Sequence, residues 1–535
     1  TLAMIADLAL DSARGNSGTL IAQWFHGMRR SAEDKNNLEI KDFVEAFNRG
    51  YKSASESLLN PKEGTIITVM RAVAEKASEL EIKGCNNYQI FLKGCYDAAE
   101  VALQNTKNTL QILKKTNVVD AGALGFVLIF QGVLHMTQKG SQIQTTHLDI
   151  SYEHDKIEAL KKDIDFTIHN KFCTECIIKS DNINRKGLKE SVKDFGDSMV
   201  LAGSKQRVKL HIHTNEPAKF FNTCEQFGNV SDRKADDMTK QEHTRHHDDG
   251  TDVAIIADSG ADIPEDYLKD VHIVSLRYSF GSQQHLDKVT QSTEEFYNQM
   301  QVDTNHPKTS QAIPRDFKKM YDFVASHHNS IISINISSKV SGTYGSALNA
   351  SKSIKNRNIY TLDSCTVSVA QGLLAMYAID LKSQGKSFNE IIMKLEEIKN
   401  ITKVYAVFKD MQYVVKGGRI SKTVKKITDL LNIRPILTTN LSGKLKPGGI
   451  LYGKSNMALK MSYFINKKIK NYKCYRLVIA HANCLDKGEE LLENIARNNS
   501  NILSSYIVNL GGALGVHAGP GSLVVGLQEL NKDEI

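Results

Sequence analysis

Three short segments in the second half of the chain are rich in hydroxyl residues and glycine: 309–311, 336–344 and 516–521. Each stands at the end of a short apolar run or at the start of a helix-like one. Hydroxyl side chains, and backbone N–H groups at helix starts, donate hydrogen bonds to anions. We therefore predict that the three segments converge on one anionic head group. The donors that we expect are the side chains of Thr309, Ser310, Ser341 and His517 and the backbone N–H of Gly342.

A second set of candidate residues lies in the strand-like stretches 172–178 and 208–214. Side chains alternate between the two faces of a strand, so His211 and His213 point to the same face. Two imidazoles and a thiolate from a neighbouring strand would make a zinc-binding set, with Cys173 as the candidate thiolate. Cys176 is three residues further on and faces the other side of a regular strand, which weakens a Cys-x-x-Cys interpretation. The spacing leaves two interpretations open, a zinc site or strand histidines bonded to their neighbours.

Three glycine-bearing loops interrupt helix-like segments in the first part of the chain: 13–18, 61–65 and 119–125. Each precedes an apolar helix, which places backbone N–H groups and the positive end of a helix dipole at the loop. Taken singly, a glycine or asparagine before a helix is ordinary capping. The chain contains no Walker-type Gly-x-x-x-x-Gly-Lys-Ser/Thr loop.

The elements that must position these residues change along the chain. Apolar residues recur at helical spacing up to about residue 140, and period-two alternation appears between residues 150 and 240. From residue 252, short apolar runs alternate with helical segments, which predicts a parallel sheet with ligand groups at the carboxyl ends of its strands. The predicted fold is multidomain. It comprises an all-α domain over 1–140, a small α+β domain over 150–240 and a two-lobed α/β domain over 252–535.

The composition excludes several classes of protein. The chain has 535 residues, of which 41% are hydrophobic and 24% charged, as is typical of globular proteins. Its net charge of +8 is spread along the sequence, so we expect no nucleic-acid partner. No apolar run reaches the roughly 18 residues of a spanning helix. The eight cysteines lack regular spacing, which predicts a reducing compartment and a cytoplasmic location. The first residues read as the interior of a helix without an initiator Met, so we expect a fragment or a processed product.

Together and in this order, the three N-terminal loops resemble the nucleotide-binding domain of the dihydroxyacetone kinase family, which is also the kinase domain of bacterial fatty acid kinase. The resemblance implies a helical barrel that binds ATP with Mg²⁺ at one end. The family's metal-binding loop, of Asp-Gly-Asp-Thr-Gly-Thr-Asn type, has no counterpart before Ala13, so no catalytic residue is assigned. The residues implied in nucleotide binding are Asn16, Ser17, Gly18, Gly64, Thr65, Asp120 and Gly122.

Two further resemblances cover the rest of the chain. The pattern Cys-Thr-Glu, Gly-Asp-Ser and His-x-His-Thr-Asn resembles the middle domain of fatty acid kinase, where the residues matching Cys173, His211 and His213 ligate a structural zinc. The C-terminal half resembles the DegV family of fatty-acid-binding proteins, through the three hydroxyl segments and a Lys-Gly-Gly-Arg-Ile motif. The resemblance implies that the hydroxyl segments bind the carboxylate of a long-chain fatty acid. From its chemistry, we expect the guanidinium of Arg419, between two glycines and an apolar residue, to meet the phosphate or the kinase domain bidentately.

The resemblances imply an ATP-dependent fatty acid kinase whose kinase and substrate-binding modules are fused in one chain, with an acyl phosphate as product. An alternative is a fatty acid carrier with an inactive or truncated kinase-like domain. A sugar kinase of the dihydroxyacetone type is a weaker alternative, because it leaves the C-terminal half without a role. The kinase-like domain also allows a homodimer.

Overall fold

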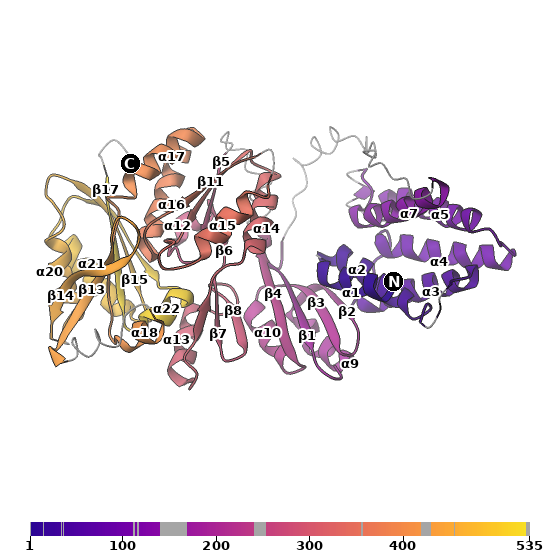
Figure 1. Cartoon of the computed structure of the whole chain (residues 1–535), viewed down its shortest axis with the longest axis horizontal. Helices are drawn as coiled ribbons and strands as arrows, with labels where there is room; N and C mark the ends of the chain where they lie inside the picture. The colour runs from indigo at the N-terminus through magenta and orange to yellow at the C-terminus, as the bar shows by residue number, and fades with distance from the viewer. Residues whose placement is uncertain are drawn as a thin grey trace. The chain divides into compact units, whose positions relative to one another are not determined.

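The chain forms two compact units, Thr1–Thr239 and Lys240–Ile535 (Figure 1). Arg419 and the predicted domain boundaries at 140–150 and 240–252 lie outside the residues that the structure describes. The structure is a computed structural model that describes residues 2–13, 15–33, 35, 37–110, 113–114, 117–139, 168–239, 253–354, 357–418, 430–453 and 455–530.

The first part of the N-terminal unit is helical, as its apolar periodicity predicts. Trp24 lies at the centre of its core, with its ring centroid 5.7 Å from that of Phe47 and 5.0 Å from that of Phe126. Gly50 permits this packing, because a Cβ atom there would lie 2.7 Å from the indole ring. The described helices are α1 (Leu2–Ser12), α2 (Gly15–Arg29), α3 (Ile40–Ser57), α4 (Ile66–Ile82), α5 (Tyr88–Thr109) and α7 (Ala121–Lys139).

The second part of this unit is an antiparallel sheet with the strand order β2-β3-β1-β4. Its strands are β1 (Phe172–Lys179), β2 (Gly196–Gly203), β3 (Arg207–Thr214) and β4 (Asn229–Asp237), and its helices are α9 (Arg185–Val192), η1 (Lys193–Phe195) and α10 (Pro217–Glu225). Cys176 faces the apolar core that β1 forms with Phe220 and Cys224 of α10. The other face of β1 therefore carries Cys173 and Glu175.

The second unit begins with a four-stranded parallel sheet of order β11-β10-β5-β6, as the alternation of strands and helices predicts. Alternate residues of β10 face opposite layers. Ile331 packs with α14 and α15, and Ile332 packs with α16. The elements of this lobe are β5 (Val253–Asp258), α12 (Glu265–Leu268), β6 (Val271–Val274), β7 (Arg277–Phe280), β8 (Gln283–Leu286), α13 (Thr293–Val302), β9 (Lys308–Ser310), α14 (Pro314–Ala325), β10 (Ser330–Asn335), α15 (Thr343–Ser351), β11 (Asn358–Asp363), α16 (Ser368–Ser383) and α17 (Phe388–Ile398).

The second lobe is built on a six-stranded sheet of order β14-β13-β12-β17-β15-β16. This sheet is mixed, because β15 and β16 are parallel while the other neighbouring strands are antiparallel. Its elements are β12 (Lys403–Val407), α18 (Gln412–Lys416), β13 (Ile433–Thr439), β14 (Leu445–Tyr452), α20 (Met457–Asn466), β15 (Cys474–His481), α21 (Leu485–Ala496), β16 (Ile502–Asn509), α22 (Gly512–Ala518) and β17 (Leu523–Leu530). Helix α16 is buried along most of its length and belongs to the core that joins the two lobes.

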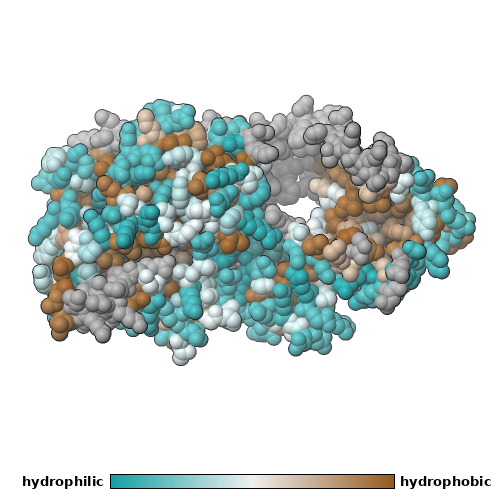
Figure 2. All heavy atoms as spheres, in the orientation of Figure 1, coloured by the Kyte–Doolittle hydropathy of each residue, from teal (hydrophilic) through white to brown (hydrophobic). Residues whose placement is uncertain are grey.

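The surface of the second unit is mostly polar on the face shown in Figure 2, with hydrophobic side chains in scattered patches. None of the described helices is both long and apolar enough to cross a membrane. The buried apolar side chains of this unit form cores beside the sheets, and further apolar side chains line one pocket.

Candidate functional site

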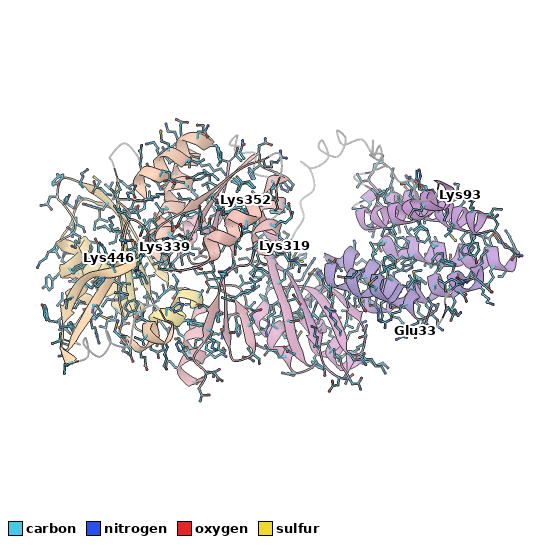
Figure 3. All side chains as sticks on the ribbon, viewed as in Figure 1. Glu33, Lys93, Lys319, Lys339, Lys352 and Lys446 are labelled. Atoms are coloured by element: carbon cyan, nitrogen blue, oxygen red, sulfur yellow. The ribbon has the colours of Figure 1, made fainter. Side chains whose placement is uncertain are left out.

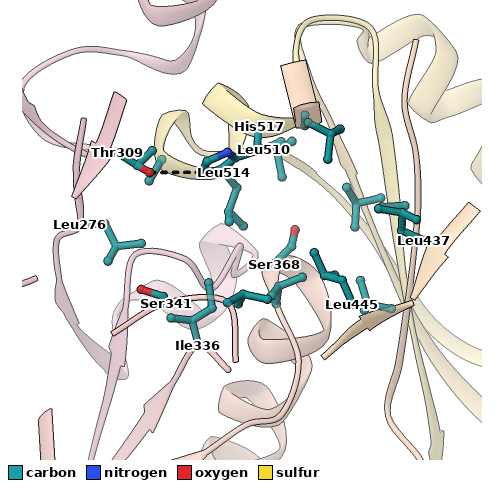
Figure 4. A pocket seen from close by; sticks show the side chains of 18 of the residues that line it. Leu276, Thr309, Ile336, Ser341, Ser368, Leu437, Leu445, Leu510, Leu514 and His517 are labelled. Carbon is teal, nitrogen blue, oxygen red and sulfur yellow. Dashed lines mark hydrogen bonds between the residues drawn. The ribbon is translucent and has the colours of Figure 1, made fainter. Parts of the chain in front are cut away.

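A pocket of about 680 Å³ lies in the second unit, with walls from both lobes (Figure 4). Its polar residues include Thr309, Ser341 and His517, so the structure brings together the three hydroxyl segments. In Figure 4, Thr309 and Ser341 lie on one side, whereas Leu437 and Leu445 lie on the opposite side. The apolar lining consists of Leu276, Ile336, Val340, Val367, Val404, Ala406, Phe408, Val414, Leu437, Leu445, Leu510, Ala513, Leu514, Ala518 and Val524.

The polar side of the pocket is organised around His517 in the last turn of α22. Its Nε2 atom lies 3.1 Å from Oγ1 of Thr309, on β9 (Figure 4). The imidazole packs against Gly417, where a Cβ atom would lie 2.0 Å from Nδ1. Only glycine fits at that position, so the end of α18 fixes the orientation of the ring.

Ser341 and Gly342 form the start of α15. The Oγ atom of Ser341 accepts from the backbone N–H of Thr343 at 3.3 Å and lies 2.8 Å from Oγ1 of Thr343. Gly342 is the N-cap, and a Cβ atom there would lie 1.8 Å from Oε1 of Gln311. Ser310 and Lys339 also line the pocket, and both are exposed (Figure 3 labels Lys339). Hydroxyl, N–H and cationic groups therefore lie together on one side of a mostly apolar cavity, which Ser368 and Thr438 also line.

Two buried carboxylates hold the N-terminal end of α22 and thereby position His517. Asp262 accepts from the backbone N–H of Gly511 at 3.0 Å, and Asp287 accepts from that of Ala513 at 3.1 Å. The Oγ atom of Ser368 donates to Asp262 at 2.6 Å, and Ser368 lines the pocket with a left-handed backbone, φ +57°. Negative charge at a helix N-terminus is stabilising, so this network fixes both the helix and the pocket wall.

The three N-terminal loops lie next to one another at the N-terminal ends of α2, α4 and α7. A Cβ atom on Gly122 would lie 2.3 Å from Oγ of Ser17, so the first and third loops are in contact. The carboxylate of Asp120 accepts from the backbone N–H of Ala123 at 2.8 Å and also from that of Ile66. Burial raises the pKa of Asp120, against the opposing effect of these two bonds.

The remaining predicted nucleotide residues are distributed over the same loops. Asn16, Ser17 and Gly18 lie in the first turn of α2, and Oδ1 of Asn16 is buried without a hydrogen-bond partner among the described residues. Thr65 is the N-cap of α4, with its hydroxyl donating to the carbonyl of Lys62 at 2.7 Å. Gly64 has φ +81°, which suits a residue without a side chain. Three neighbouring helix N-termini with a buried polar atom have a geometry that suits phosphate groups.

A cluster of metal-ligating side chains lies on the middle sheet. Ligand atoms of Cys173, His211 and His213 all lie within 4.8 Å of one another, and we call these residues the thiol–imidazole cluster. The strand register explains this proximity, because Cys173 lies opposite His213 where β1 pairs with β3. Burial raises the pKa of the Cys173 thiol to about 11. Burial, together with the neighbouring His211, lowers the pKa of His213.

The donor set fits a zinc ion. The Nδ1 atom of His211 lies 3.0 Å from Oε1 of Glu175, whereas its buried Nε2 atom has no hydrogen-bond partner among the described residues. A histidine that binds zinc through one ring nitrogen usually donates from the other to a carboxylate or a carbonyl. Glu175 received no role from the sequence, although it is two residues after Cys173 and thus on the same face of β1.

Family models match all three parts of the chain. The DAK2 domain matches residues 1–135, the FakA-like middle domain of fatty acid kinase matches 169–245, and the DegV family of uncharacterised proteins matches 252–530. These matches confirm the three resemblances predicted from the sequence motifs.

Individual relatives match only part of the chain or are themselves shorter. An uncharacterised protein of Staphylococcus saprophyticus is 31% identical over 256 residues, which are 45% of this chain and 45% of that protein, so the chain spans less than half of that relative. A DegV domain-containing protein of Clostridium acetobutylicum is 28% identical over 282 residues, 51% of this chain and 97% of that protein. The structure of DegV from Bacillus subtilis, described as a fatty-acid-binding protein, has 25% identity and a TM-score of 0.48, covering 52% of this chain and 99% of that one. Since the family match at residues 252–530 spans more than half of the 535 residues, the chain belongs to the DegV family.

Proposed function

We propose that the chain binds a long-chain fatty acid in the pocket of the second unit and phosphorylates its carboxylate with ATP held by the N-terminal loops. The observation that carries this proposal is a cavity with apolar walls and hydrogen-bond donors on one side. Its volume of about 680 Å³ is ample for one lipid chain. Membership of the DegV family and the match to the FakA-like middle domain of fatty acid kinase support the same substrate class.

The energetics of lipid binding favour this type of pocket. Burying an acyl chain contributes roughly 0.8 kcal/mol per CH₂ group, or about 10 kcal/mol before the costs of binding for a long chain. A buried carboxylate without partners would cancel much of that gain. Thr309, Ser341 and His517 supply side-chain donors, and Gly342 supplies a backbone N–H at the start of a helix. We assign the carboxylate to this side of the pocket and the acyl chain to the wall that includes Leu437 and Leu445.

In the proposed reaction, a carboxylate oxygen attacks the γ-phosphorus of ATP. The bond between that phosphorus and the β,γ-bridging oxygen breaks, and ADP leaves an acyl phosphate behind. Catalysis of this kind depends on positioning and on neutralising the charge of the phosphates. The N-termini of α2, α4 and α7 suit the nucleotide phosphates. Among the described residues, only the thiol–imidazole cluster gathers three or more side chains that could hold a metal ion, so these helix ends hold no such set for Mg²⁺.

We further propose that the thiol–imidazole cluster binds zinc. The orphaned Nε2 atom of His211 and the sulfur of Cys173 are a typical donor pair for this ion. When bound, the ion would link β1 to β3 and stabilise the middle sheet. All eight cysteines are free thiols, which supports a reducing compartment such as the cytoplasm.

The proposal is tested by incubating the chain with ATP, Mg²⁺ and oleate and trapping acyl phosphate with hydroxylamine. We expect oleoyl hydroxamate that requires ATP, and less of it from a His517→Gln variant. If oleate binds but no hydroxamate forms, the chain is a fatty acid carrier. If oleate binds to neither protein, the assignment of the pocket is wrong.

A further inference from the structure

A single buried side chain, Glu175 of β1, joins the thiol–imidazole cluster to the start of α2. Its Oε1 atom accepts from the backbone N–H of Gly15 at 2.8 Å and lies 3.0 Å from Nδ1 of His211. Gly15 is the first residue of α2 and immediately precedes Asn16. One carboxylate oxygen thus contacts both a candidate metal ligand and the helix end that carries three candidate nucleotide residues.

A buried lysine makes a second connection between the same two regions. Lys209 of β3 donates from Nζ to the carbonyl of Ala13, and this nitrogen lies 3.7 Å from Oε2 of Glu175. Glu175, Lys209 and His211 are 4%, 5% and 1% exposed, so water does not screen these contacts. The middle sheet therefore holds the chain on either side of the entrance to α2, at Ala13 and at Gly15.

The strand pattern explains why these groups act as one unit. Residues 209, 211 and 213 of β3 share one face because side chains alternate, and Glu175 lies opposite His211 in the pairing of β1 with β3. This row of side chains on one face of β3 leads from His213, in the thiol–imidazole cluster, to Lys209, which contacts Ala13 just before α2. A ligand on Nε2 of His211 fixes the imidazole, and the imidazole fixes the carboxylate that receives the Gly15 N–H.

We infer that Glu175 is a positioning residue through which metal binding at the thiol–imidazole cluster orders the first turn of α2. The role of this ordering in catalysis rests on the proposed function, because that turn is where we place the nucleotide phosphates. Metal occupancy then sets the affinity of the chain for ATP without any contact between the metal and the nucleotide. Glu175 itself touches neither ATP nor fatty acid in this arrangement.

Hydrogen–deuterium exchange of the full chain, measured by mass spectrometry with added Zn²⁺ and with a chelator, tests the coupling directly. In the unmodified chain we expect Zn²⁺ to slow exchange of the Gly15 amide by about tenfold or more, the effect of securing its hydrogen bond to the charged Glu175. Glu175→Ala should abolish this response. Glu175→Gln keeps an acceptor oxygen without the charge, so it should restore part of it. A purely structural role would change exchange equally with and without Zn²⁺.

Glu225→Gln is the matched control, since it removes a carboxylate of the same domain that pairs with Arg233 of β4. It should leave the Zn²⁺ response intact. Affinity for ATP should fall about tenfold on chelation in the unmodified chain and should no longer respond to Zn²⁺ in Glu175→Ala. A full Zn²⁺ response in both Glu175 variants, or no response in the unmodified chain, would overturn the inference. A Zn²⁺ response that depends on Glu175, in a chain that makes no acyl phosphate, would instead reject the kinase activity and keep the coupling.

Discussion

Replacing Thr309 by valine tests the polar side of the pocket with little change in shape. The substitution removes one hydroxyl that contacts Nε2 of His517 at 3.1 Å and replaces it with a methyl group of similar size. A hydrogen bond to a charged group contributes about 1.5–3 kcal/mol. The hydroxyl is half-buried and already bonded in the free protein, so the lower end of that range applies. We therefore expect Thr309→Val to weaken fatty acid binding by about tenfold.

The assay titrates delipidated protein with oleate and, in a separate experiment, with oleyl alcohol. Binding is measured by the displacement of a fluorescent lipid. Both ligands bury a similar hydrocarbon chain, but only oleate carries a carboxylate, so the loss should be confined to oleate. Thr438→Val is the matched control, because Thr438 lines the same pocket from β13 and is not among the expected donors. Equal losses for the two ligands, or equal losses for the two variants, would refute the placement of the carboxylate at Thr309.

Three further predictions address separate parts of the chain. Ser341→Ala should weaken fatty acid binding, because Ser341 lines the pocket, and unchanged affinity in the same titration would count against its role as a donor. Cys173→Ser should reduce the zinc content measured by plasma mass spectrometry, whereas Cys176→Ser, on the core side of β1, should retain it. Burial raises the pKa of Asp258 to about 6, from an ordinary value of 3.8, against the opposing bonds from the N–H groups of Ile336 and Gly260. The protonated Asp258 carboxyl therefore makes its full contribution to the free energy of unfolding below about pH 4, and this contribution is lost as the pH rises through about 6. Between pH 4 and 7, the free energy of unfolding measured in urea should fall by up to about 3 kcal/mol more for the unmodified chain than for Asp258→Asn. A difference between the two proteins that does not change with pH would contradict the raised pKa.

The sequence could place only some of the polar residues of the pocket by the rule that the strand ends of a parallel sheet meet at one edge. Ser341 follows β10 of the parallel sheet, as the alternation of strands and helices predicts, whereas Thr309 lies within β9 of the small antiparallel sheet β8-β7-β9. The apolar wall could not be predicted in the same way. Leu437 and Leu445 belong to a hairpin of the second lobe, and an apolar strand residue does not reveal whether it faces a pocket or a core.

For the thiol–imidazole cluster too, the contacts set by local strand geometry could be predicted from the sequence, and a contact between distant segments could not. Period-two alternation was enough to place His211 and His213 on one face and Cys176 on the other. The contact of Glu175 with Gly15 joins residues 160 positions apart, and no local pattern encodes it. Asp120 is a related case. The sequence indicates a residue beside the nucleotide, and the structure adds that its carboxylate binds the N–H of Ala123 and so caps α7.

The pocket and the thiol–imidazole cluster share one structural feature: a buried carboxylate that accepts from a backbone N–H at the start of a helix and also contacts a side chain of the site. At the pocket, Asp262 contacts Gly511 and Ser368. At the cluster, Glu175 contacts Gly15 and His211. Such a carboxylate is favoured by the helix dipole and makes the site geometry and the helix position depend on each other. Substrate-binding groups on these helices are thus held by residues that make no contact with the proposed ligands. Loss of function on replacing these carboxylates would therefore report on positioning rather than on direct binding.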